Sequence, residues 1–109
     1  MPTDARNLSQ FRSAIFHALS DPMRLEILEF LRDGEKCVCE IVPHLGLIQP
    51  VVSRHLKILK DVGIVRCRKD GTNRLYSVVD SKIFTVIDNI TSELTDSLRA
   101  EIVKNITGR

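Results

Sequence analysis

The side chains best placed for chemistry lie on one face of a helix predicted over residues 50–62. At about 100° per residue, Ser53, Arg54 and Lys57 share that face, whereas most residues on the opposite side are apolar. A hydroxyl group and cations on an exposed helix face can contact the phosphates and base edges of duplex DNA. An ordinary amphipathic surface helix would show the same pattern, so the segment that follows decides between the two interpretations.

A basic hairpin is predicted directly after this helix, over residues 64–79. Two runs rich in β-branched and aromatic residues flank a turn that contains Asp70, Gly71 and Asn73, which is a hairpin signal. A helix, a glycine (Gly63) and a basic hairpin in this order are typical of a winged helix. The hairpin carries the cations Arg66, Arg68, Lys69 and Arg74.

The charge of the chain is unevenly distributed. From Gln49 to Val79 seven Lys and Arg residues face two Asp residues, a formal charge of +5, whereas the whole chain carries +2 and the remainder therefore −3. A local basic surface on a helix and a hairpin is the electrostatic footprint of duplex binding. The alternative from another class, a winged-helix module used only for protein contacts, has no need of the exposed polar arc at residues 53–57.

The remaining elements predict one domain over residues 1–109. The apolar stripes on the first and last helices have more surface than a domain of this size can cover. We therefore expect both helices to form a homodimer interface. The predicted fold class is mainly α with a small β-hairpin: a winged helix-turn-helix, dimeric through its first and last helices. The predicted parts are a first helix over 8–19, a second that starts at Asp21-Pro22, a helix-turn-helix over about 38–62, a wing over about 64–79 and one long dimer helix over about 81–106.

The composition disfavours several classes of protein. No apolar run approaches the length of a membrane span, and residues 1–7 are polar and have no signal-peptide core. Three cysteines, an odd number without a secretion signal, predict reduced thiols and a cytoplasmic location. No nucleophile–base pair, phosphate loop or carboxylate dyad stands out, so an enzyme is disfavoured.

Three segments carry a family resemblance: Leu19–Leu28, Cys37–Glu40 and Gln49–Leu56, with Leu59 and Gly63–Val65 behind the last. Together they resemble the ArsR/SmtB family of winged-helix repressors, and the resemblance spans roughly residues 8–100. It implies a homodimer that binds a double-stranded DNA operator and represses transcription. It also implies release of the DNA when an inducer binds, often a metal or metalloid ion, with no cofactor required.

The polar arc and the resemblance together predict the DNA contacts. His55 lies at the edge of the apolar side, and the family's Ser-x-His-Leu motif gives it a role in contacting DNA; a hydrogen-bonded histidine at the edge of the core is the alternative. Ile48 departs from the family, which often has Ser there, so Gln49 is expected to cap the helix and Pro50 to begin it. The predicted contact residues are Gln49, Pro50, Ser53, Arg54, His55, Lys57, Arg68, Lys69, Asn73 and Arg74.

Cys37 and Cys39 form the candidate inducer site. Soft thiolates suit As(III), Sb(III), Cd(II) and Pb(II), and the Cys-Val-Cys sequence resembles the arsenic-sensing branch of the family. The position of that branch's third cysteine is Val42 here. Cys67, on the first hairpin strand, is expected to lie one strand too far away to take its place.

The family's second site, at the dimer helix, needs histidines, and residues 81–109 contain none. Three interpretations of the cysteine pair therefore stay open. It is a metalloid or soft-metal site completed by an external thiol or by the partner chain, a redox switch, or a vestige in a regulator that responds to something else or to nothing. We take the first as the leading hypothesis.

Overall fold

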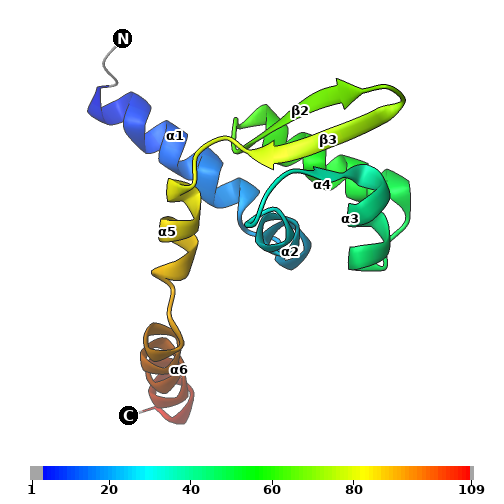
Figure 1. Cartoon of the computed structure of the whole chain (residues 1–109). Coiled ribbons are helices and arrows are strands. Elements are labelled where there is room, and N and C mark those ends of the chain that lie inside the picture. The colour runs from blue at the N-terminus through cyan, green and yellow to red at the C-terminus, as the bar shows by residue number, and fades with distance from the viewer. Residues whose placement is uncertain (1–3, 109) are drawn as a thin grey trace.

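The computed structural model describes residues 4–108, and its elements follow the predicted order (Figure 1). Residues 1–3 and 109 of the predicted single domain lie outside the described part. The prediction of a mainly helical winged fold is confirmed. The elements are α1 (Ala5–Ala18), α2 (Pro22–Phe30), β1 (Lys36–Cys37), α3 (Val38–Leu45), α4 (Gln49–Asp61), β2 (Val65–Asp70), β3 (Asn73–Val78), α5 (Lys82–Asp88) and α6 (Ser92–Thr107).

The wing is a small antiparallel sheet in the strand order β1-β3-β2. Strands β2 and β3 pair from Val65 opposite Val78 to Asp70 opposite Asn73, and the turn between them contains Gly71 at a φ of 64°. The two-residue strand β1 pairs with β3, with Cys37 opposite Leu75. The start of α3 is therefore attached directly to the wing, and the hairpin runs alongside α4 in Figure 1.

One apolar core joins the first five helices to the base of the wing. Most of its fully buried side chains come from α2, α3 and α4, and α1, α5 and the start of β2 close it from the sides. Helix α4 packs against α2, α3 and β2, so its inner face is fixed while its outer face stays free. The largest fully buried side chains are Ile27, Leu28, Ile41, Val52, Leu56, Leu59 and Val65.

The stop and start signals found in the sequence act as expected. Asp21 caps α2 and accepts hydrogen bonds from the backbone N–H groups of Met23 and Arg24, at 2.8 and 3.3 Å. Gly63 follows α4 with a φ of 81°, a left-handed conformation that favours glycine. The chain can thereby turn straight from the helix into β2.

The prediction of one long helix over residues 81–106 is wrong. The structure has two helices, α5 and α6, separated at residues 89–91. Thr91 is the reason for the second start: its hydroxyl oxygen accepts a hydrogen bond from the backbone N–H of Leu94 at 3.1 Å, which caps α6. Apolar spacing alone did not reveal this break, because the stripe continues across it.

Helix α5 packs on the core, whereas α6 does not. Phe84 of α5 is buried, and the Arg32 guanidinium lies 4.4 Å from its ring centre while donating to both carboxylate oxygens of Asp88 at 2.9 and 3.0 Å. No residue of α6 is buried, and Figure 1 shows α6 set apart from the other helices. Within residues 4–108 no helix is long and apolar enough to cross a membrane.

Arg24 is the one buried charged residue among residues 4–108. Its guanidinium donates to the backbone carbonyls of Ala18 at 2.6 Å and His17 at 3.3 Å, where α1 ends. It also lies 3.3 Å from Nδ1 of His55 on α4. A single side chain of α2 thus links the end of α1 to α4.

Replacing Arg24 by Ala should lower the free energy of unfolding by about 2–3 kcal/mol, because the buried carbonyl of Ala18 loses its donor. Urea unfolding followed by circular dichroism measures this loss. The matched control is Arg12→Ala on α1, an exposed arginine, which should change stability by less than about 0.5 kcal/mol. Equal stability of the two variants would contradict the role assigned to Arg24.

Candidate nucleic-acid interface

Helix α4 begins one residue earlier than predicted. Ile48, not Gln49, is the capping residue: its backbone is extended and its carbonyl accepts from Val51 and Val52 at 3.1 and 3.2 Å, without a side-chain cap. Gln49 is therefore the first helical residue and Pro50 the second. Proline is tolerated there because the first helical N–H groups have no intrahelical partner. Since the Gln49 side chain makes no cap, it is free to face outward.

The polar face of α4 is exposed as predicted. Gln49, Pro50, Ser53, Arg54 and Lys57 are all solvent-exposed, and the apolar side of the same helix is buried in the core. Lys57 forms an exposed ion pair with Asp61, at 2.8 Å and four residues along the helix. An exposed pair of this kind is weak, so Lys57 can exchange Asp61 for a phosphate.

His55 differs from the other predicted contact residues. Its side chain is only partly exposed, and its ring nitrogen lies beside the Arg24 guanidinium. This contact supports the structural role that the sequence left as the alternative. Within the described chain, His55 joins α4 to the buried arginine.

The cations of the wing fall into two groups. Arg68 is engaged by Glu35, which precedes β1: the guanidinium donates to both carboxylate oxygens at 2.8 and 2.9 Å. The hydrogen bond from Arg68 holds the pKa of Glu35 below its usual value. Lys69 and Arg74, by contrast, are exposed and form no salt bridge in the part of the chain that the structure describes. Glu35 was missed by sequence reasoning because it is 33 residues away from Arg68.

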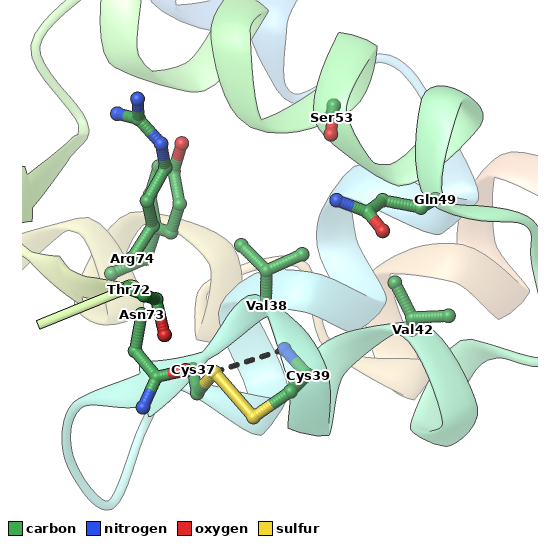
Figure 2. Close-up of a pocket in the computed structure, with 10 residues that line it drawn as sticks. Cys37, Val38, Cys39, Val42, Gln49, Ser53, Thr72, Asn73 and Arg74 are labelled. Atoms are coloured by element: carbon green, nitrogen blue, oxygen red, sulfur yellow. Dashed lines mark hydrogen bonds between the residues drawn. A yellow bond between two sulfur atoms is a disulfide. The ribbon is translucent and has the colours of Figure 1, made fainter.

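A cavity of about 430 Å³ lies between α3, α4 and the wing (Figure 2). Its walls join residues that the sequence assigned to two separate functions. The cysteine pair at the start of α3 forms one part, and predicted DNA contacts form the others. The lining residues are Cys37, Val38, Cys39, Val42, Gln49, Ser53, Thr72, Asn73, Arg74 and Tyr76.

Cys37 and Cys39 differ in environment. Cys37 is 6% exposed and caps α3, with its sulfur accepting from the backbone N–H of Cys39 at 3.0 Å, whereas Cys39 is exposed. The Glu40 carboxylate accepts from the backbone N–H of Cys37 at 2.9 Å and completes a capping box. The two sulfurs are joined by a disulfide, drawn in Figure 2, so the prediction of reduced thiols is wrong for this pair, whereas Cys67 is a free thiol. Cys37 thus takes part in both hydrogen bonds of the capping box, one through its sulfur and one through its backbone N–H.

A third metal ligand is absent near this pair in the described residues. No cluster of three His, Cys, Asp or Glu side chains occurs between residues 4 and 108. Cys67 lies on β2, opposite Tyr76 of β3. Strand β3 therefore separates Cys67 from β1, which confirms the predicted strand order. Val42 lines the cavity where the third sulfur of a Cys-Val-Cys-x-x-Cys site would come from. The pair on its own therefore offers two sulfur ligands.

A winged helix-turn-helix with an exposed basic face defines a class of DNA-binding regulators. Residues 21–66 match the model of the bacterial regulatory protein arsR family. An uncharacterised HTH-type transcriptional regulator of Methanocaldococcus jannaschii is 47% identical over 74 residues, 67% of this chain and 83% of its own length. The arsenical resistance operon repressor of Staphylococcus aureus is 37% identical over 94 residues, covering 86% and 89% of the two chains.

A solved structure agrees with these relatives. The crystal structure of a possible transcriptional regulatory protein from Mycobacterium bovis, 28% identical, superposes with a TM-score of 0.71 over 76% of this chain and 92% of its own. The chain belongs to the ArsR/SmtB family of winged helix-turn-helix transcriptional repressors, and it is not an enzyme.

The Glu35–Arg68 pair predicts an effect that sequence alone does not suggest. Glu35→Gln should release the Arg68 charge, raise the affinity for DNA of any sequence and steepen the salt dependence by about 0.9 in log–log slope for one added phosphate contact. Fluorescence anisotropy at several salt concentrations measures both. Glu26→Gln, an exposed glutamate on α2, makes the same change in net charge and should leave the slope unaltered. An equal effect of the two variants would mean that only overall charge matters.

Proposed function

We propose that this chain is a repressor that binds a double-stranded DNA operator as a homodimer and is released by a thiophilic metalloid such as As(III). The observation that carries the DNA-binding part is the position of the exposed polar face of α4 beside the wing, with both lining one cavity. Bound Sb(III), Cd(II) or Pb(II) would use the same thiolates. We place this regulator in the cytoplasm, where operator DNA is found.

Helix α4 and the wing have different parts in DNA binding. Ser53 and Arg54 face outward from the first half of α4, where recognition helices contact base edges. Gln49, Pro50 and Lys57 flank them on the same exposed side. On the wing, Lys69, Asn73 and Arg74 meet the phosphate backbone, and Arg68 joins them once it leaves Glu35.

Arg54→Ala tests the recognition role of α4. It should weaken operator binding by about 1–3 kcal/mol, the value of a bidentate base contact, and reduce discrimination between operator and random DNA. A gel shift with both DNAs at two salt concentrations measures the effect. Lys60→Ala, farther along the same helix, serves as the charge-matched control. Operator binding by Arg54→Ala as tight as that of the wild type would show that Arg54 reads no base.

The homodimer is supported by apolar surface that the single chain leaves uncovered. Phe11 and Phe16 on α1 are 62% and 58% exposed, and α6 buries none of its residues. Exposed patches of this extent mark interaction sites in small domains. An isologous interface through α1, α5 and α6 would place the two α4 helices about 34 Å apart, in successive major grooves. The apolar residues exposed on α6 are Leu94, Leu98, Ile102, Val103 and Ile106.

Leu98→Glu should convert the dimer to a monomer, because it places a charge in the centre of the α6 stripe. Sedimentation at micromolar concentration should give the mass of two chains for the wild type and of one chain for the variant. Glu101→Gln on the same helix is exposed and should remain dimeric. A wild-type monomer under these conditions would contradict the proposed assembly.

The cysteine pair supports two kinds of response. Two sulfurs at the edge of the DNA-facing cavity suit a soft metalloid, and the disulfide that joins them favours a thiol redox response as the second candidate. For a metalloid response, the DNA-free protein must bind the metalloid more tightly than the DNA-bound protein does. For a redox response, the change in redox state of the pair must be more favourable in the DNA-free protein than in the DNA-bound protein.

Cys37→Ser/Cys39→Ser should keep operator affinity and lose release by As(III), because Ser also caps helices but is a poor ligand for soft ions. Cys67→Ser should respond as the wild type does. The two candidates are distinguished by measuring operator affinity of the reduced wild type with As(III) and, separately, operator affinity of the oxidised wild type without it. A loss of affinity in the first measurement supports the metalloid response, and a loss in the second supports the redox response. Normal release of the double variant by As(III), or loss of release in Cys67→Ser, would place the sensor elsewhere.

A further inference from the structure

The cavity beside the cysteine pair has the size and lining of a small-molecule site. Its volume of about 430 Å³ lies within the range of roughly 300–1,000 Å³ that ligand pockets occupy. Figure 2 shows the disulfide on one wall, Gln49 and Ser53 of α4 on another, and Asn73 and Arg74 of the wing on a third. A bare ion bound to the two sulfurs would leave most of this space unused.

Trivalent arsenic forms three bonds, and the pair supplies two sulfurs. Val42 occupies the position from which a third protein thiolate would come, and it lines the same cavity. Residues 4–108 hold no third cysteine, histidine or carboxylate clustered with the pair. The third ligand must therefore enter the cavity from outside this chain.

We propose that a small monothiol carrying a carboxylate binds in this cavity and supplies the third sulfur to As(III). This inference rests on the proposed function and names the ligand class of the same site. Arg74 is the reason for the carboxylate: it is the one cation among the lining residues, and the described part of the chain gives it no salt-bridge partner. A guanidinium binds a carboxylate through two parallel hydrogen bonds. Gln49, Ser53 and Asn73 supply further polar partners for a peptide-like molecule.

The binding step exchanges oxygen for sulfur without a change in oxidation state. Two molecules of the monothiol first reduce the Cys37–Cys39 disulfide to two thiols and are themselves oxidised to a disulfide. As(OH)₃ then loses three As–O bonds and gains three As–S bonds, two to Cys37 and Cys39 and one to a further monothiol. The three thiol protons leave with the three hydroxide groups as water. Arsenic is trivalent before and after the step.

The bound monothiol would compete with DNA directly. Gln49, Ser53, Asn73 and Arg74 are proposed DNA contacts, and the same four residues line the cavity. A carboxylate on Arg74 removes a cation from the phosphate-binding surface, and the thiol's body stands between α4 and the wing. Release then needs no large movement of α4, because the occupant and the DNA use the same side chains.

Native mass spectrometry of the reduced full-length protein tests the inference without DNA. The protein is reduced with a phosphine, which adds no thiol, and As(III) is added with glutathione, with glutathione ethyl ester or with no thiol. We expect one arsenic and one glutathione per chain, and about tenfold tighter As(III) binding with glutathione than without it. The ester, which blocks one carboxylate, and Arg74→Gln should each reduce that gain.

Val42→Cys provides the decisive variant. It supplies a third protein thiolate and should bind As(III) tightly without glutathione. Val42→Ser, in which the serine is close to cysteine in size but has no thiol, should still need glutathione for tight binding. Three results would overturn the inference: As(III) binding by the wild type that is as tight without a thiol as with glutathione, arsenic that links two chains, or no arsenic bound in any condition. Operator binding by the reduced, arsenic-free protein is measured separately, and its absence would overturn the proposed function instead.

Discussion

The guanidinium of Arg24 is the interaction on which the arrangement of the helices depends. Apolar packing holds α1, α2 and α4 together, but it is non-directional, whereas the bonds of Arg24 to the Ala18 carbonyl and to the His55 ring fix direction. Arg24 lies in the first turn of α2, next to the capping residue Asp21. Burial by itself would raise the pKa of Asp21. The hydrogen bonds from the backbone N–H groups of Met23 and Arg24, together with nearby positive charge, outweigh this effect and lower the pKa. The buried charge is accommodated because each of the three guanidinium nitrogens has a polar partner.

The sulfur of Cys37 has two structural roles, one in capping a helix and one in lining a cavity. It closes the first turn of α3 by accepting a hydrogen bond from the backbone N–H of Cys39, and it forms part of the wall of the cavity between α3, α4 and the wing. Sulfur is a weak acceptor, so the Glu40 carboxylate, bound to the Cys37 N–H, provides the stronger part of the cap. Because β1 pairs with β3, a change at this sulfur reaches the wing through two residues of strand.

Much of the fold could be predicted because its signals are local. Asp21-Pro22, Gly63 and the turn at Asp70-Gly71 each act through their own backbone geometry, and the spacing of apolar residues by three or four positions identifies the buried face of α4. The features that were missed depend on other information. The break before α6 comes from one threonine cap within an uninterrupted apolar stripe. The bonds from Arg68 to Glu35 and from Arg24 to His55 join residues more than thirty positions apart, and only the folded chain brings them together.

Helix α6 buries none of its sixteen residues within its own chain. A helix of that length is only marginally stable in water by itself, so in the proposed homodimer its folding and its docking on the second chain would form one equilibrium. The ordered fraction of this segment then depends on how many copies the cell contains. In the proposed homodimer, protein abundance would therefore act as a signal in its own right: dilution below the dissociation constant of the dimer would unfold α6 and separate the two chains, without any change at the cysteines.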